Sequence, residues 1–198
     1  MRRAHAQWLA RGMVPPDAFR DQPTLHTARI RLEPLTAEHF DGIWAMVREP
    51  EVARLTGAHQ PFTEAGIRGW LTTRADHHDR ADWAVVRVND GVVIGDVAFN
   101  GFDPDNASTG FRIALAGPHV FGHGYGTEAT RLAVDYALDT VGLHRVELEV
   151  FSFNPRARRV YEKCGFVREG VRRDALYWAG ARYDAIVMAV LSTDPRPR

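Results

Sequence analysis

The chain has a single cysteine, Cys164, among its 198 residues. One thiol cannot form an internal disulfide, so the fold must hold together without one. Cys164 falls on the apolar side of a predicted helix, where a packed thiol is commoner than a nucleophile. The cysteine content therefore gives no support for secretion or for a covalent cysteine mechanism.

The formal net charge is zero, because 25 lysines and arginines balance 25 aspartates and glutamates. A balanced chain has no general attraction to nucleic acid or to an anionic membrane, so we expect it to bind neither. The sequence has no apolar run of membrane-spanning length, and Arg2 and Arg3 are not followed by the apolar segment of an export signal. We therefore expect a cytoplasmic protein.

A pattern of metal ligands is lacking as well. His77 and His78 are adjacent, and neighbouring side chains on a helix point about 100° apart, so they would be poor joint ligands. We predict no metal site, and we interpret this polar stretch as a solvated helix end.

Length and composition fit one domain that follows a tail. Residues 1–25 mix arginines with Pro15, Pro16 and Pro23 and show no clear strand or long helix, so we expect an N-terminal extension there. Residues 26–194 carry regular apolar patterns and are predicted to form a single domain.

The body of the chain alternates between strand and helix patterns. Thr36 and Thr63 each precede a stretch with helical apolar spacing, and an Asn-Asp-Gly turn at 89–91 marks a hairpin. Glu147 and Glu149 alternate with apolar residues, so we expect them to face solvent. The strands are predicted near residues 30–35, 83–88, 92–99, 109–115, 145–150, 167–178 and 183–191. This order predicts a mixed α/β layered fold.

Glycine is concentrated at residues 121–126, where the sequence is Phe-Gly-His-Gly-Tyr-Gly and a periodic helix follows. Such a loop can turn its N–H groups one way, and the helix start adds unpaired N–H groups and a positive dipole end, which favour an anion. Thr127 and Glu128 fit neither a Walker loop nor a Rossmann fingerprint. The pattern predicts a phosphate-binding loop, and a glycine-rich surface turn remains the alternative.

A second motif begins at Asn154 and ends in Tyr-Glu-Lys-Cys-Gly-Phe at residues 161–166. Asn154 suits a helix N-cap and Gly165 suits a helix end, so the segment has a purely structural interpretation. Tyr161 lies on the apolar stripe of the helix, where a core aromatic is about as common as a catalytic one. The residues alone leave both interpretations open.

The two motifs, in this order and with a helix and a strand between them, resemble the GNAT acetyltransferases of the RimJ/RimL-like branch. The resemblance covers residues 29–191. It implies an α/β fold with a mixed, mostly antiparallel sheet of about seven strands, splayed in the middle and flanked by helices on both faces. It also implies acetyl-CoA as the cosubstrate and direct transfer of acetyl to an amine.

The resemblance further implies roles for individual residues. The loop N–H groups and the Thr127 hydroxyl would hold the pyrophosphate, and the strand residues Ile113, Ala114 and Leu115 would pair with the pantetheine arm. Tyr161 would act as the general acid that protonates the leaving thiolate. The implied cosubstrate-binding set also includes Phe121, Gly122, His123, Gly124, Tyr125, Gly126, Asn154, Arg156 and Arg159.

Two departures from the family pattern leave details open. Phe121 stands where many relatives carry Gln or Arg, so one polar contact to the pyrophosphate is missing. Ser108 stands where many carry Glu, so the usual general base is missing as well. Asp96 on the preceding strand and His119 beside the loop are the substitute bases, and each has a structural hydrogen-bonding role as its alternative.

The missing carboxylate favours α-amines as acceptors. An α-amino group with a pKa of about 8 is about a tenth neutral at neutral pH, whereas a lysine ammonium with a pKa of about 10.4 is neutral in about four parts in ten thousand. We expect a peptide N-terminus or a small α-amino compound as acceptor. An aminoglycoside or a polyamine is the second hypothesis, and a sensor that binds acetyl-CoA without turnover is the third.

The oligomeric state stays open at this point. Homodimers are common among the proteins that the chain resembles. The final hairpin, with Tyr177, Trp178 and Tyr183, offers an apolar contact surface for a homodimer.

Overall fold

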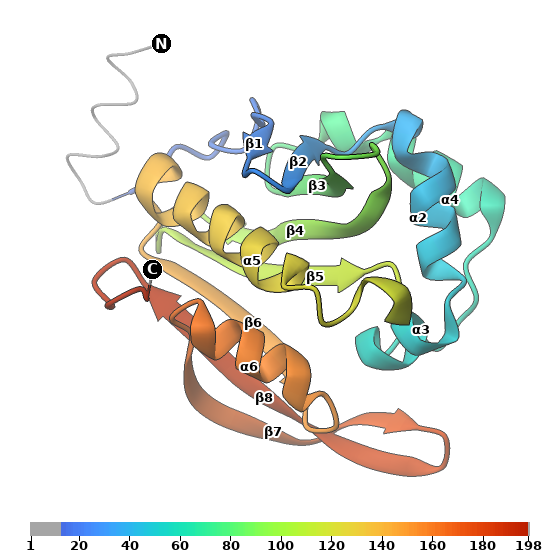
Figure 1. The fold of residues 1–198 in the computed structure, drawn as a ribbon. Helices are drawn as coiled ribbons and strands as arrows, with labels where there is room; N and C mark the ends of the chain where they lie inside the picture. The colour runs from blue at the N-terminus through green and yellow to red at the C-terminus, as the bar shows by residue number, and fades with distance from the viewer. Residues whose placement is uncertain (1–12, 198) are drawn as a thin grey trace.

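Stretches of alternating apolar residues pair into an eight-stranded sheet in the computed structural model, which describes residues 13–197 (Figure 1). The strands are β1 Leu25–His26, β2 Ile30–Pro34, β3 Ala81–Arg87, β4 Val93–Asp103, β5 Ser108–Leu115, β6 Arg145–Phe151, β7 Val167–Trp178 and β8 Ala181–Leu191. Across the sheet their order is β1-β2-β3-β4-β5-β6-β8-β7, and every neighbouring pair is antiparallel except β5 and β6. The predicted fold class is confirmed.

The strand count differs slightly from the expected seven. Leu25 and His26 pair with Leu32 and Arg31 and add a two-residue strand at the edge. A strand this short leaves too little alternation in the sequence to be recognised as one.

Helices cover both faces of the sheet. They are the short helices η1 Ala37–His39, η2 Arg74–Asp76 and η3 Pro118–Val120, the π-helix η4 Tyr136–Val141, and α2 Phe40–Val47, α3 Pro50–Thr56, α4 Glu64–Thr72, α5 Tyr125–Asp135 and α6 Pro155–Lys163. Trp83 and Val85 of β3 belong to the core that α5 and α6 cover, whereas Ala84 and Val86 belong to the core beneath α2 and α4. The alternation along β3 therefore buries both of its sides.

The helix predicted after Thr36 is interrupted in the structure. Thr36 caps η1, and α2 follows it but ends at Val47. Pro50 then occupies the first position of α3, where its missing N–H costs nothing, and Gly57 ends α3 with a φ of 70°. We did not predict α3, because seven residues are too few to show a clear helical period. Thr63 caps α4 as expected, since its side chain accepts a hydrogen bond from the Gly66 N–H.

The end of the predicted extension packs onto the body. Val14 and Phe19 are buried in the core beneath α5, and the Phe19 ring stacks on Phe99 with centroids 5.7 Å apart. The indole N–H of Trp83 donates to the Pro23 carbonyl at 2.9 Å. The part of the expected extension that precedes residue 13 lies outside the described residues.

The sheet opens between its only parallel pair of strands. Pairing of β5 with β6 runs from Ser108 with Arg145 to Gly110 with Glu147 and stops there. Beyond that point β5 stays paired with β4 as far as Leu115, and β6 stays paired with β8 as far as Phe151. The two strands therefore diverge, as Figure 1 shows, and this is the predicted splay in the middle of the sheet.

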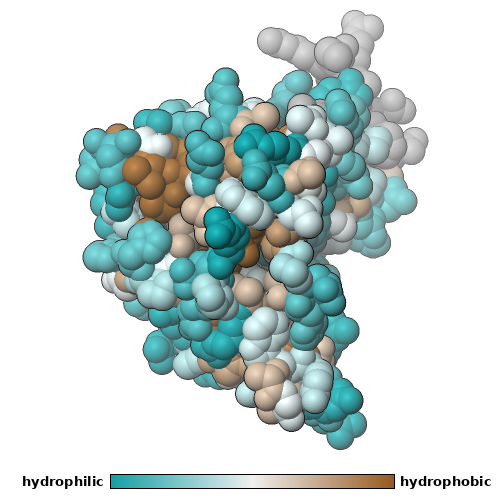
Figure 2. Space-filling view, turned by 90° about the vertical axis from the view of Figure 1, so that its right-hand side faces the viewer, coloured by the Kyte–Doolittle hydropathy of each residue, from teal (hydrophilic) through white to brown (hydrophobic). Residues whose placement is uncertain are grey.

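The surface on the side of α2, α3 and α4 is largely hydrophilic. Figure 2 shows this side with one hydrophobic patch and with further apolar residues recessed between hydrophilic ones. Among residues 13–197, no helix has the length and apolar character needed to cross a membrane.

Two glycines in helices give a matched test of the packing of α2 against β4. A Cβ added at Gly42 would lie 2.4 Å from Val93 Cβ, whereas a Cβ at Gly69 of α4 would meet open space. We expect Gly42→Ala to lower the free energy of unfolding by about 1–3 kcal/mol, because overpacking displaces the helix. Gly69→Ala should raise it by roughly 0.5–1 kcal/mol, because alanine loses less backbone entropy in a helix.

Urea unfolding of the two variants beside the unchanged protein measures both effects. A Gly42→Ala variant as stable as the Gly69→Ala variant would show that α2 does not lie this close to β4.

Candidate active site

The gap between β5 and β6 opens into a cavity of about 510 Å³. Its walls come from the second half of β5, the end of β6, the glycine loop at 121–126, the first turn of α5 and one side of α6. Val52, Leu55 and Thr56 of α3 complete the lining. The splay in the sheet is therefore the reason that a cavity exists at this place.

The glycine loop has the backbone that an anion cradle needs. Gly122 and Gly124 adopt left-handed φ angles of 82° and 86°, where other residues would be strained. Gly124 is the residue before α5, and Gly126 and Thr127 in the first turn of that helix line the cavity. The first turn of an eleven-residue helix thus brings unpaired N–H groups and a positive dipole end to the cavity wall. Phosphate oxygens suit such a place.

Arg29, just before β2, contacts this loop on the side away from the cavity. Its guanidinium donates to the His123 carbonyl at 3.0 Å and to the Glu128 carboxylate at 2.8 Å, and it lies 5.1 Å from the centre of the Tyr125 ring. The His123 side chain is exposed. The other residues of the predicted loop line the cavity, whereas His123 does not. His123 therefore contributes its carbonyl to the support of the loop.

Three basic residues of α6 stand at the edge of the cavity. Arg156 and Arg159 line it as expected, and the Arg156 guanidinium lies 4.0 Å from the centre of the Phe121 ring. Lys163 lines it too, although we did not predict it. Its place one helical turn after Arg159 is the signal that could have found it. The three cations are available to the phosphates of an anionic ligand.

Asn154 keeps its structural role and also reaches the cavity. Its side-chain oxygen accepts a hydrogen bond from the Ala157 N–H at 3.1 Å, which caps α6. The same side chain lines the cavity, and its amide NH₂ still has two hydrogens to donate. The two interpretations of Asn154 from the sequence are therefore compatible.

Tyr161 lies where the core of the sheet meets the cavity. Its ring packs against Phe111 and Phe166 with centroid distances of 6.4 Å and 5.8 Å, and the residue lines the cavity. Burial among these apolar side chains raises the pKa of the Tyr161 phenol above its ordinary value. Within the described part of the chain, its hydroxyl makes no hydrogen bond, so the O–H is available to a ligand in the cavity.

The strand residues Ile113, Ala114 and Leu115 line the cavity. They lie past Gly110, where β5 has left β6 but is still paired with β4. The edge of β5 that faces the gap can therefore present its N–H and C=O groups to an extended ligand.

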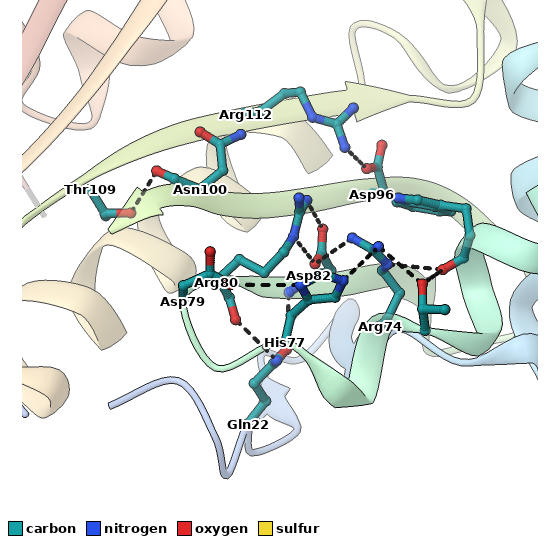
Figure 3. A network of polar contacts seen from close by, with 12 residues as sticks. Gln22, Arg74, His77, Asp79, Arg80, Asp82, Asp96, Asn100, Thr109 and Arg112 are labelled. Carbon is teal, nitrogen blue, oxygen red and sulfur yellow. Dashed lines mark hydrogen bonds and ion pairs between the residues drawn. The ribbon is translucent and has the colours of Figure 1, made fainter. Parts of the chain in front are cut away.

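Asp96 is held away from the cavity in a buried polar network (Figure 3). It is 2% exposed, and one carboxylate oxygen accepts from Arg112 Nη2 at 2.6 Å. Burial raises the pKa of Asp96, and the nearby Arg112 offsets part of this effect. In the same network Arg80 donates to Asp82 through two bonds of 2.6 Å, and Arg74 lies 3.7 Å from Asp82. This position fits the structural role that was the alternative for Asp96, and its role as a base stays a prediction.

The second candidate base, His119, is also outside the cavity lining. It lies on η3 with its side chain exposed. Among the described residues, neither of the two candidate bases therefore lines the cavity.

Cys164 is buried, donates to the Thr127 carbonyl at 3.5 Å, and has a pKa raised to about 11 by burial, which fits a packed thiol.

Arg112 and Glu149 line the cavity, and we did not predict either of them as a site residue. The alternation along β6 placed Glu147 and Glu149 on the polar side of the strand. Both are exposed there as expected, and Glu149 in addition lies beside the gap in the sheet. Alternation gives the side of a strand but not where the neighbouring strand departs, so the sequence could not distinguish the two glutamates.

These features define an enzyme class that takes a phosphorylated cosubstrate into a gap between two strands of a sheet. The chain matches the acetyltransferase (GNAT) domain family over residues 29–167. It belongs to that family and is an N-acetyltransferase that uses acetyl-CoA as its cosubstrate.

Similar proteins include curated relatives and solved structures. The FsC-acetyl coenzyme A-N(2)-transacetylase of Aspergillus fumigatus is 32% identical over 155 residues, which cover 73% of this chain and 65% of that protein. A spermidine N(1)-acetyltransferase of Escherichia coli is 29% identical over 170 residues, covering 85% of this chain and 88% of the relative. The crystal structure of a GCN5-related N-acetyltransferase from Brucella melitensis has a TM-score of 0.75 at 27% identity and covers 91% of this chain and 82% of that one.

No group of three or more His, Cys, Asp or Glu side chains that could hold a metal occurs within residues 13–197. The expected absence of nucleic-acid and membrane partners, the cytoplasmic location and the homodimer all remain predictions.

Removal of the Tyr161 hydroxyl tests its role as the general acid. We expect Tyr161→Phe to lower kcat by about 10²–10⁴-fold, because the thiolate would lose its positioned proton donor. The dissociation constant for acetyl-CoA should change by less than about twofold, since the ring still fills its place between Phe111 and Phe166. Steady-state kinetics and calorimetric titration measure the two quantities.

Tyr136→Phe is the matched control, because Tyr136 is a buried tyrosine that packs on Trp83 and does not line the cavity. It should keep the full rate. Equal rates for the two variants would exclude Tyr161 as the proton donor.

Proposed function

We propose that this N-acetyltransferase acts on α-amines and belongs to the RimJ/RimL-like branch of its family. The favoured acceptors are a protein or peptide N-terminus and small α-amino compounds. The proposal rests on the gap beside β5, which runs between the glycine loop on one side and two oppositely charged side chains, Arg112 and Glu149, on the other. A thioester and an amine can meet in such a gap without crossing the sheet.

The cosubstrate would be held mainly by backbone groups. The N–H groups of residues 122–126 and the Thr127 hydroxyl would bind the pyrophosphate, and Arg156, Arg159 and Lys163 would add charge at the same edge. The pantetheine arm would pair with residues 113–115 of β5, and the Asn154 amide would donate to it. Phe121 supplies no polar contact, so the backbone carries more of the binding.

The reaction would proceed by direct attack of the neutral amine on the thioester. A backbone N–H near Ile113 would stabilise the oxyanion, since a fixed donor acts where negative charge develops. Tyr161 would protonate the leaving thiolate. Because burial disfavours the phenolate, we place this transfer in concert with the loss of a proton from the attacking nitrogen, which restores the phenol.

The acceptor preference follows from the two candidate bases lying outside the cavity. Whichever group takes the proton of the acceptor then works against the pKa of its ammonium group, so an amine of lower pKa is favoured. At neutral pH the neutral fraction is about a tenth for an α-amine and about four parts in ten thousand for a lysine side chain.

A polyamine is the second candidate acceptor. The likeness to a spermidine N(1)-acetyltransferase over 85% of the chain is the observation that favours it. Against it stands Arg112 at the cavity, because a guanidinium repels a polycation.

Release of free thiol from acetyl-CoA across a panel of acceptors tests the proposal. The panel contains short peptides with free N-termini, the same peptides with blocked N-termini and an internal lysine, free amino acids, spermidine and an aminoglycoside. We expect kcat/KM at neutral pH to be about 100-fold higher for α-amines than for lysine side chains, in line with their neutral fractions.

A preference for spermidine, the aminoglycoside or the lysine side chain would overturn the assignment to α-amines. Absence of acetyl-CoA binding would overturn the roles given to the glycine loop and the α6 cations.

A further inference from the structure

Two opposite charges flank the gap on the face of the sheet away from α5 and α6. Phe111 and Ile113 of β5 pack with the core beneath those helices, so Arg112 between them points to the opposite face. On β6 the two neighbours of Glu149 belong to the same core, so Glu149 also points to the opposite face. Both side chains line the cavity.

The register of the two strands places these charges across from each other. Gly110 is paired with Glu147, and this is the last pair before the strands diverge. Arg112 and Glu149 each lie two residues further along their strand. They would be opposite each other if the strands stayed paired. Because the strands diverge after Gly110, the gap lies between them.

Arg112 and Glu149 each have one partner outside the gap, and each still has hydrogen-bonding groups available to a ligand. Arg112 donates one of its five N–H groups to the buried Asp96, and its side chain remains 42% exposed. Glu149 accepts from Arg172, and its side chain is also 42% exposed. Among the acidic residues that the structure describes, Glu149 is the one that lines the cavity.

We propose that Glu149 binds the ammonium group of the acceptor and takes its proton, and that Arg112 binds an anionic group of the same acceptor. This inference rests on the proposed acetyl transfer and narrows the acceptor to an amine that also carries a carboxylate, such as a free amino acid. Asp96 acts here through Arg112, because its buried carboxylate fixes the guanidinium at the edge of the gap.

The proton balance of the reaction is complete with these groups. The Glu149 carboxylate takes one proton from the ammonium, and the neutral nitrogen forms a bond to the acetyl carbon while the carbon–sulfur bond breaks. The electron pair of that bond leaves on sulfur, which takes a proton from Tyr161. The nitrogen gives its second proton to Tyr161 as the amide forms, and Glu149 returns its proton to water.

An amino acid and its primary amide form the decisive pair of substrates, because the amide lacks the carboxylate; since loss of that charge also lowers the pKa of the amine, kcat/KM is compared at equal concentrations of the neutral amine. We use alanine, leucine and phenylalanine with their amides, and spermidine as the polycation. The unchanged protein should use the acids at least about tenfold better in kcat/KM, the usual effect of one charged hydrogen bond. Arg112→Gln should abolish this preference through KM, and Arg112→Lys should restore part of it. Glu149→Gln should lower kcat/KM for acids and amides alike by about 10²-fold or more.

Glu147→Gln and Arg182→Gln are the matched controls, since both side chains are exposed on the same sheet and neither lines the cavity. Both should behave as the unchanged protein. Acetyl-CoA affinity, measured by calorimetry, should be the same in all variants and also shows that each is folded.

Equal use of acids and amides by the unchanged protein would overturn the role of Arg112, and so would a preference for spermidine. Full activity of Glu149→Gln would overturn the role of Glu149. These results leave the proposed acetyl transfer in place, whereas acetyl-CoA binding without acetylation of any of these amines, or of the peptides with free N-termini in the first panel, would refute both proposals.

Discussion

The parallel pairing between β5 and β6 stops after three residue pairs, and the rest of the site depends on this interruption. Beyond Gly110, β5 follows β4 and β6 follows β8, so each strand keeps one hydrogen-bonded neighbour and exposes one edge to the gap. An extended ligand can replace the missing strand, which satisfies the backbone groups that the splay leaves open. Beside the gap, the glycine loop leads into α5, and α6 supplies the buried Tyr161.

The two faces of the sheet offer different groups to the two substrates. On the α5 and α6 face, helix N–H groups and the cations of α6 suit a phosphorylated cosubstrate. On the opposite face, Arg112 and Glu149 present one charge of each sign to the acceptor. Asp96 belongs to neither substrate, because it is buried and its carboxylate accepts a hydrogen bond from Arg112, which holds that guanidinium at the edge of the gap (Figure 3).

The fold, and the loop and helix residues that line the cavity, were largely predictable from the sequence, because local signals specify them. An Asn-Asp-Gly turn, the caps at Thr63 and Asn154 and the glycines at 121–126 each act over a few residues. The acceptor half was not predictable. The sequence placed Asp96 on a strand and Glu149 on the polar side of another strand, but only the three-dimensional structure shows which carboxylate is buried and which faces the gap.

Backbone hydrogen exchange with and without acetyl-CoA tests whether the ligand takes the place of a strand beside β5. We expect exchange to slow in residues 111–115 and in the loop at 121–127 when acetyl-CoA binds, while residues 167–178 of the outer strand β7 keep their rates. Binding of acetyl-CoA with unchanged exchange in residues 111–115 would contradict this placement of the ligand.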